Sequence, residues 1–192
     1  MSGRSVLVVA MLAAGCGYHL VGTGTTVPAG ARTLSIALFQ NRTREHGLEV
    51  RVRRAIEDEF RRRGTLRVVP HPEGDLALSG TVRRFASVPV AFSATDEAVQ
   101  YQSVVQVSVR LVERESGRVL FENKALQETQ DFGAVSGVVI ASSPHFQQGT
   151  IDARDLADLT NVQLGETRRH AALDSLLELL ARDVYLQTME GF

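Results

Sequence analysis

The chain has 192 residues, of which 44% are hydrophobic, and this content excludes a disordered polypeptide and is enough for a folded domain with a core. Its 21 basic and 22 acidic residues give a net charge of −1, which excludes the broad positive field of a nucleic-acid-binding protein. The five histidines are scattered, and no nucleophile elbow, phosphate loop or dinucleotide motif is present. We therefore expect a protein that is not an enzyme, with no catalytic residues, no metal and no cofactor.

The first sixteen residues have the pattern of a bacterial lipoprotein signal. Arg4 precedes a short apolar run, Val6–Ala14, and small residues lead into Cys16, the only cysteine. The run is too short to span a bilayer, which takes about 20 residues. Its small-small-Gly-Cys ending resembles a lipobox, so we predict that residues 1–15 are a signal peptide and that Cys16 carries lipid. An ordinary signal peptide beside a buried cysteine is the alternative.

The segment after the cysteine is predicted to connect the lipid to a domain. Gly17, rather than aspartate, follows Cys16, and by resemblance to lipoprotein sorting this implies anchoring in the outer membrane, at its periplasmic face. Residues 16–32 are rich in glycine and are typical of a flexible tether. The remainder, 33–192, is predicted to form a single domain.

The first part of this domain predicts a strand, a helix and a second strand. Apolar and polar residues alternate over 33–39, which favours a half-buried strand. Over 48–60 the apolar residues recur every fourth position, which predicts an amphipathic helix that Gly64 ends. Residues 65–69 predict the second strand. The apolar positions of the first strand and the helix are Leu34, Ile36, Leu38, Leu48, Val52, Ile56 and Phe60.

The second part predicts three further strands and a long helix. Alternation predicts strands at 76–82 and 101–111, and a tight turn leads to a return strand from 119 to about 130. Leucines at helical spacing predict a C-terminal helix over 166–185. The connection 133–165 fits no element, and we expect a long irregular segment there.

The order of these elements predicts an α+β fold in two layers. Two helices, each with one apolar stripe, are expected to pack on one face of a mixed, mostly antiparallel sheet of about four to five strands. The stripe of the first helix should pack against the leucines of the C-terminal helix, which are Leu173, Leu176 and Leu180.

Two clusters of arginine are candidates for holding an anion. Arg61–Arg63 lies at the end of the first helix, where cations offset the helix dipole, and we favour that interpretation. Arg83 and Arg84 are neighbours in a strand and should point to opposite faces, which directs one of them toward the helix layer or its rim. Solvation of both at a strand end is the alternative, and we favour it.

A series of short motifs, in order along the chain, resembles the LptE family of lipopolysaccharide-assembly lipoproteins. The motifs are Cys16–Leu20, Val27–Pro28, Thr33–Ile36, Phe39–Thr43, Gly47–Glu49, Asp75–Val82, Gln100–Tyr101 and Ser116–Phe121. The resemblance covers about residues 16–130 together with the last helix.

The resemblance implies a two-layer sandwich lodged inside the outer-membrane barrel LptD, which it plugs and helps to assemble, and contact with lipopolysaccharide on its way to the cell surface. A near-neutral domain with polar strands suits the polar interior of a barrel, and a lipid anchor holds it at the inner leaflet. The alternative is a generic lipid-anchored periplasmic adaptor of another envelope complex. An anchored hydrolase would need a nucleophile–base pair that the sequence lacks.

Members of this family contact glycolipid through basic residues in two loops. Here those loops, Phe92–Glu97 and Asp131–Gly133, are acidic or neutral. The basic side chains that remain beside the sheet are Arg83, Arg84 and Lys124. Because arginine binds phosphate through a planar fork of donors, we predict that these three form the lipopolysaccharide-binding patch at one end of the sheet.

Overall fold

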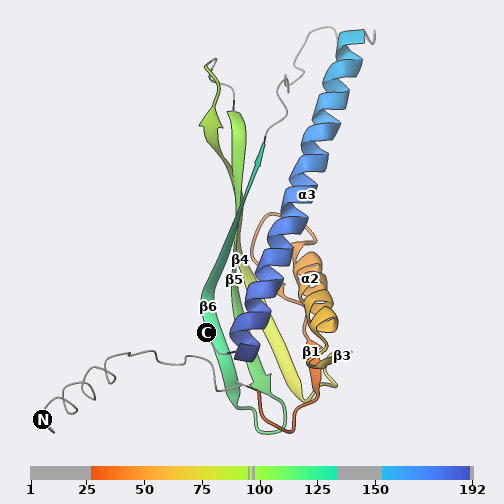
Figure 1. Cartoon of the computed structure of the whole chain (residues 1–192), viewed down its shortest axis with the longest axis vertical. Coiled ribbons are helices and arrows are strands. Elements are labelled where there is room, and N and C mark those ends of the chain that lie inside the picture. Colours follow the sequence, from red (N-terminus) through yellow and green to blue (C-terminus); the bar gives the residue numbers. More distant parts are fainter. Residues whose placement is uncertain (1–26, 95, 97, 134–152, 191–192) are drawn as a thin grey trace, which may run out of the picture.

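The computed structural model describes residues 27–94, 96, 98–133 and 153–190, and within the last helix it describes the side chains of residues 165–189 (Figure 1). The elements in chain order are β1 (Thr33–Ile36), β2 (Gln40–Asn41), α2 (Leu48–Arg63), β3 (Arg67–Val69), β4 (Leu76–Phe92), β5 (Ala98–Glu113), β6 (Val119–Gly133) and α3 (Ala153–Glu190). The predicted α+β class is confirmed. The sheet has six strands rather than the predicted four to five, because the two-residue β2 was missed.

The sheet is mixed, with a short parallel part and a long antiparallel part. Its strands run in the order β3-β1-β4-β5-β6, and β2 pairs with β4 off this path. β1 is parallel to both of its neighbours, since α2 carries the chain back between β1 and β3. β4, β5 and β6 form an antiparallel meander, and their hairpin end extends beyond α2 (Figure 1).

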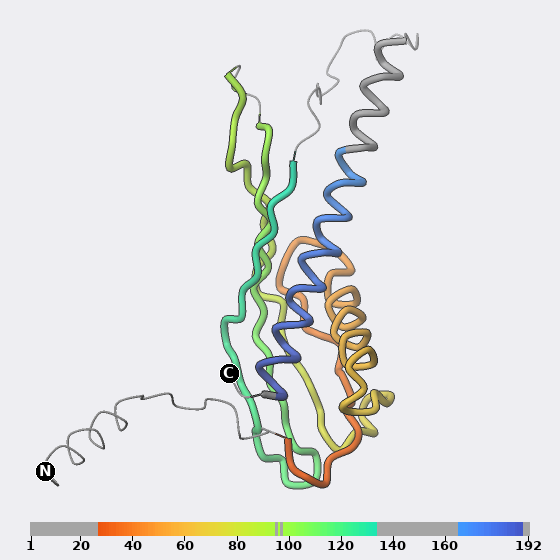
Figure 2. The backbone as a smooth tube through the Cα atoms, in the orientation of Figure 1, coloured from red at the N-terminus to blue at the C-terminus, as the bar shows by residue number. Residues whose placement is uncertain are grey.

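Both helices lie on the same face of the sheet, with α3 over β5 and β6 and α2 beside it (Figure 2). The predicted packing of the two apolar stripes is confirmed, because both belong to a single core cluster. The ring of Phe60 on α2 meets the ring of Tyr185 on α3 edge-on, with centroids 5.1 Å apart. The fully buried side chains at the centre of this core include Leu34, Val52, Ile56, Leu78, Leu111, Leu176 and Leu180.

The helix α2 forms where the apolar spacing predicted it, and glycines bound it at both ends. Gly47 precedes it with φ of 75° and Gly64 follows it with φ of 68°, a backbone conformation that glycine adopts without a Cβ penalty. The N–H of Gly64 donates to the carbonyl of Phe60 at 3.0 Å, which satisfies one of the last free carbonyls of the helix.

The first strand is shorter than the alternation predicted. β1 ends at Ile36, and Leu38, which we placed on the buried side, is 55% exposed. Phe39 enters the core in its place, and its ring lies directly on the backbone of Gly80, where a Cβ would overlap it. The alternation fails here because the chain leaves the strand geometry between β1 and β2, so the period of two no longer assigns faces.

The C-terminal helix is longer than predicted at both ends. It begins at Ala153 rather than at 166, so the prediction of irregular chain was wrong for 153–165, and residues 134–152 lie outside the described part. Gly133 belongs to β6. A helix of 38 residues is about 57 Å long, and among residues 165–189, whose side chains are described, the buried ones begin at Ala172, where α2 and the sheet cover the helix.

The segment before β1 is attached to the domain within its last residues. Val27 and Ala31 pack against the core, so the predicted tether does not extend unchanged to residue 32. The carboxylate of Asp75 accepts hydrogen bonds from the N–H groups of Arg32 at 3.0 Å and Thr33 at 2.9 Å. These bonds, with the Thr33 hydroxyl, hold the pKa of Asp75 below its usual range.

Replacing Phe60 with alanine tests the shared core. The Phe60 ring is 1% exposed, so Phe60→Ala should lower the free energy of unfolding by roughly 3–5 kcal/mol, measured by urea denaturation. Leu38→Ala is the matched control, because Leu38 is exposed, and should change it by less than about 0.5 kcal/mol. A loss below about 1 kcal/mol for Phe60→Ala would contradict the packing.

Replacing Asp75 with asparagine tests the attachment of β1 to the start of β4. Since the folded pKa of Asp75 lies below its ordinary value of 3.8, the carboxylate stabilises the fold above that pH, and this contribution disappears as the pH falls through the folded pKa. Urea denaturation over a series of acidic pH values should show a smaller loss of stability for Asp75→Asn than for the wild type. Asp96→Asn, at the hairpin tip, is the control and should follow the wild-type curve; parallel curves for Asp75→Asn would refute the assignment.

Candidate functional site: the uncovered face of the sheet

One face of the antiparallel meander is covered by no element of the described part of the chain. Along β5 the side chains of Val105, Val107, Val109 and Leu111 alternate into the core, as predicted. The residues between them therefore project from the opposite face. Both helices pack on the core side, so the second face of the sheet is open (Figure 1).

The uncovered face carries ladders of polar side chains across the strands. Arg110 of β5 pairs with Glu122 of β6 at 3.1 Å. Nearer the hairpin tip, the amides of Gln102 and Gln100 donate to the Asp131 carboxylate at 3.0 and 3.3 Å. Directly opposite residues of an antiparallel pair share a face, so these polar residues form rows across the strands, with the apolar pair Ala86–Val104 between them. The other paired members of these rows include Thr81, Arg84, Gln106, Ser108, Gln127 and Thr129.

Two β-bulges bring the predicted basic residues to nearly the same level of the sheet. In β4 the pairing shifts between Val82 and Arg84, so Arg83 is the extra residue. In β6 the pairing shifts around Lys124, opposite the same part of β5. The bulged segments lie on either side of β5 and are therefore about 10 Å apart across two strand spacings. The structure thus places Arg83, Arg84 and Lys124 near one another.

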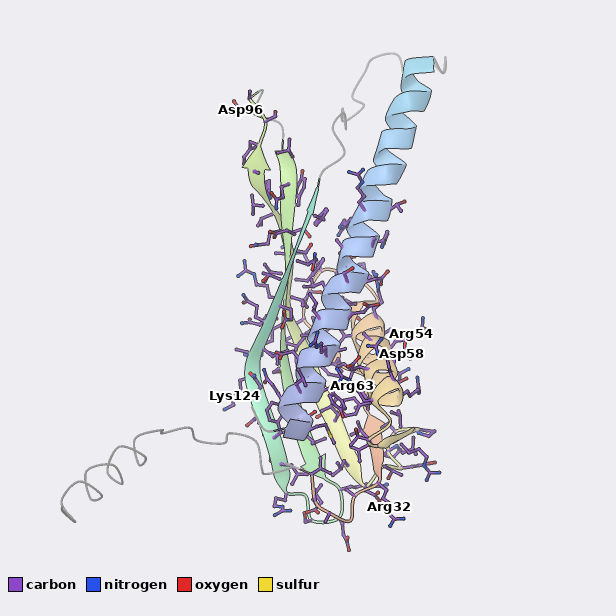
Figure 3. All side chains as sticks on the ribbon, viewed as in Figure 1. Arg32, Arg54, Asp58, Arg63, Asp96 and Lys124 are labelled. Carbon is purple, nitrogen blue, oxygen red and sulfur yellow. The ribbon has the colours of Figure 1, made fainter. Side chains whose placement is uncertain are left out.

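The position of these residues differs from the sequence prediction, whereas the exposure of Arg83 and Arg84 agrees with the interpretation that we favoured. They lie in the middle of β4 and β6, not at a strand end, because β4 continues to Phe92. Both Arg83 and Arg84 are exposed, because the bulge interrupts the alternation that would have turned one toward the helices. Lys124 projects away from the helix layer (Figure 3). None of the three has an ion pair or hydrogen bond within the described part of the chain.

The end of the β4–β5 hairpin is apolar and exposed. Val88, Val90, Phe92 and Val99 are 44%, 46%, 57% and 38% exposed. Asp96 stands at the tip, at the opposite end of the molecule from Arg32 (Figure 3). As expected from its composition, this loop offers no basic side chain.

The contact between β6 and α3 contains polar groups among apolar ones. The Asn123 amide donates to Gln187 at 2.8 Å, and the Gln187 amide donates to Asp183 at 3.0 Å. Burial, together with the negative charge of Asp183, raises the pKa of Glu128 on the neighbouring part of β6. This contact therefore carries excess negative charge, and the basic patch lies on the other side of the sheet.

A second charged cluster lies at the C-terminal end of α2 and contains two of the arginines, Arg62 and Arg63, that the sequence offered as an anion site; its buried carboxylate, Glu59, was not identified from the sequence. Glu59 lies among the apolar positions of α2 and is 1% exposed, and Arg62 and Arg63 both hydrogen-bond to it. The sequence does contain a sign of this cluster, because Glu59 is a carboxylate three residues after Ile56 and so falls on the apolar stripe of α2.

Cys16 lies outside the described residues. Among the residues described, no group of three histidine, cysteine or acidic side chains could hold a metal, and no helix is long and apolar enough to cross a membrane.

A family model described as "LptE: Lipopolysaccharide-assembly" matches residues 31–188, which is most of the chain. The fold, with two helices on one face of a mixed sheet, is of the class that the motifs implied. The chain therefore belongs to the LptE family, a non-catalytic component of lipopolysaccharide assembly. The search of curated proteins found no match.

Several solved structures resemble this chain at low sequence identity. The PelC dodecamer from Paraburkholderia phytofirmans is 16% identical with a TM-score of 0.50, over 88% of this chain and 96% of that one. A putative lipoprotein from Caulobacter crescentus is 13% identical with a TM-score of 0.46, over 78% and 86% of the two chains. A minor lipoprotein from Acinetobacter baumannii is 11% identical with a TM-score of 0.41, over 84% and 92%.

Proposed function

We propose that this protein is an outer-membrane lipoprotein that plugs the lumen of an LptD-like barrel, supports its assembly and assists insertion of lipopolysaccharide at the cell surface. The observation that carries the proposal is the match to the lipopolysaccharide-assembly family over residues 31–188. Acylation of Cys16 after removal of residues 1–15 supplies the anchor, and two or more acyl chains hold a protein stably at a membrane surface.

The uncovered sheet face supports a location inside a barrel. The lumen of an outer-membrane barrel is polar, whereas a lipid-facing surface is apolar. The middle of this face, around Gln106, Ser108 and the Arg110–Glu122 pair, is polar and is free of any covering element of the described chain. It therefore suits hydrogen bonding to the polar inner wall of a barrel.

The orientation of the β4–β5 hairpin relative to the anchored end of the domain fits transport of lipopolysaccharide toward the cell surface. Arg32, close to where the anchored segment joins the fold, is at the opposite end from Asp96 (Figure 3). An anchor in the inner leaflet then directs the β4–β5 hairpin away from the periplasm and along the lumen. The exposed Val90 and Phe92 near the hairpin tip would meet the apolar part of the transported lipid.

The basic patch is proposed to contact the phosphates of lipopolysaccharide. Arg83, Arg84 and Lys124 are exposed at nearly the same level of the two strands that flank β5, and their side chains have no partner within the described part of the chain. Guanidinium and ammonium donors make charge-assisted hydrogen bonds to phosphate oxygens.

Site-specific photocrosslinking in cells tests the plug. A crosslinker at Gln106, on the uncovered face, should give an adduct with the outer-membrane barrel, and one at Arg54, on the outer side of α2, should give less of it. An adduct with another envelope protein and none with the barrel would instead support the generic adaptor.

The intact mass of the purified protein should show acylated Cys16 and no residues 1–15.

Replacing all three basic residues of the patch with glutamine tests the phosphate contact. Each lost charged hydrogen bond is worth about 1.5–3 kcal/mol, so lipopolysaccharide binding should weaken at least tenfold while the protein still folds and enters the barrel. Binding is measured with purified protein, and barrel association by co-purification. Unchanged lipopolysaccharide affinity in a folded, barrel-bound variant would discard the patch, and loss of barrel association alone would assign it to the protein interface.

A further inference from the structure

The C-terminal end of α2 packs against the middle of α3 around a buried carboxylate. Glu59 is the only acidic or basic side chain among the buried residues of the described chain. Burial by itself would raise the pKa of Glu59, but hydrogen bonds from Arg62 and Arg63 outweigh it and hold the pKa below its usual range. Glu59 is therefore an anion that holds two guanidinium groups at one position.

The two arginines are held in place on several sides. Arg62 pairs with one oxygen of the Glu59 carboxylate, and the Nε of Arg63 donates to the other at 2.8 Å. The Arg63 guanidinium lies over the ring of Tyr185, 5.2 Å from its centroid, and the hydroxyl of Tyr185 is 2.5 Å from that of Thr65. These contacts reduce the conformational freedom that the arginines would lose on binding a ligand.

Most of the hydrogen-bonding capacity of these two groups is unused. A guanidinium has five N–H donors, and Glu59 takes one from each arginine. Both arginines line an open cavity of about 730 Å³ formed by α2, α3 and Gln130 of β6. Its lining is completed by Glu59, Gln130, Ser175, Glu178, Leu179 and Arg182.

Arg182 supplies a third guanidinium from the other wall of the cavity. It is exposed and has no ion pair or hydrogen bond within the described part of the chain. Three arginines against the carboxylates of Glu59 and Glu178 leave the cavity with a net positive charge. The helix dipole explains basic residues in the last turn of α2, but it explains neither Arg182, which lies well before the end of α3, nor the cavity.

We propose that Arg62, Arg63 and Arg182 form an anion site that binds a phosphomonoester group. Guanidinium groups bind phosphate through parallel N–H donors, and donors from two helices can reach several oxygens of one phosphate. The site is on the helix side of the domain, away from the patch of Arg83, Arg84 and Lys124, and it does not depend on the proposed barrel role.

Phosphate titrations of the full-length acylated protein in detergent test the site. Inorganic phosphate and glucosamine 1-phosphate are titrated at low salt by calorimetry. Arg182→Gln should weaken binding about tenfold, the effect expected for loss of a hydrogen bond between charged groups. Arg54→Gln is the matched control, because it removes the same charge from α2 on the side away from α3 and should leave the affinity within about twofold (Figure 3).

The Arg182 variant is chosen because it leaves Glu59 paired, so the fold is expected to persist, and an unchanged urea midpoint checks this. Titration with phosphatidic acid vesicles shows whether the ligand is a lipid headgroup or a soluble phosphate ester. Binding to the vesicles that depends on Arg182 supports a lipid headgroup. Binding that depends on Arg182 and occurs with glucosamine 1-phosphate alone supports a soluble ester. Three results would overturn the proposal. The two variants could weaken phosphate binding equally, the protein could show no saturable phosphate binding in the millimolar range, or it could bind an oligoglutamate peptide more tightly than phosphate.

Discussion

The apolar stripes of α2 and α3 meet each other and the same face of the sheet, and the edge contact of Phe60 with Tyr185 joins the two helices in that packing. Each helix has one apolar side, and burying both sides on one sheet face leaves the other face without any cover from the described chain. The rest of the structure follows from this asymmetry. The covered face of β5 has a row of valines and a leucine, and the middle of its other face has glutamine, serine and arginine.

Irregularities in the long strands then determine which side chains gather on the open face. A strand of strict alternation would have separated Arg83 from Arg84 and directed one of them toward the core, where an unpaired charge is costly. The bulge in β4 removes that conflict, and the bulge in β6 brings Lys124 to nearly the same level. The two bulges thus gather positive charge on a surface that is otherwise near neutral.

The helix layer also contains a buried charged side chain, Glu59. A buried carboxylate on an apolar stripe is unfavourable unless it is paired, and Glu59 is paired twice. This pairing holds both Arg62 and Arg63, with Arg63 over the ring of Tyr185, at a cavity that Arg182 also lines. The two arginine clusters lie on different layers of the fold.

The sequence by itself determined the elements whose apolar periodicity is unbroken, namely α2 with its glycine ends, the alternating β5, and the packed half of α3, because periodicity reports directly which side of an element is buried. It also carried the family resemblance. It could not determine that Leu38 is exposed and Phe39 buried, that β4 and β6 bulge, or that the chain over 153–165 is helical. The exposure of Leu38 and the two bulges depend on contacts with residues distant in the chain, such as the Phe39 ring on Gly80 and the pairing of β4 and β6 with β5. Only the tertiary structure brought Arg182 to Arg62 and Arg63, because it lies on a helix more than a hundred residues away whose packing angle no local pattern encodes.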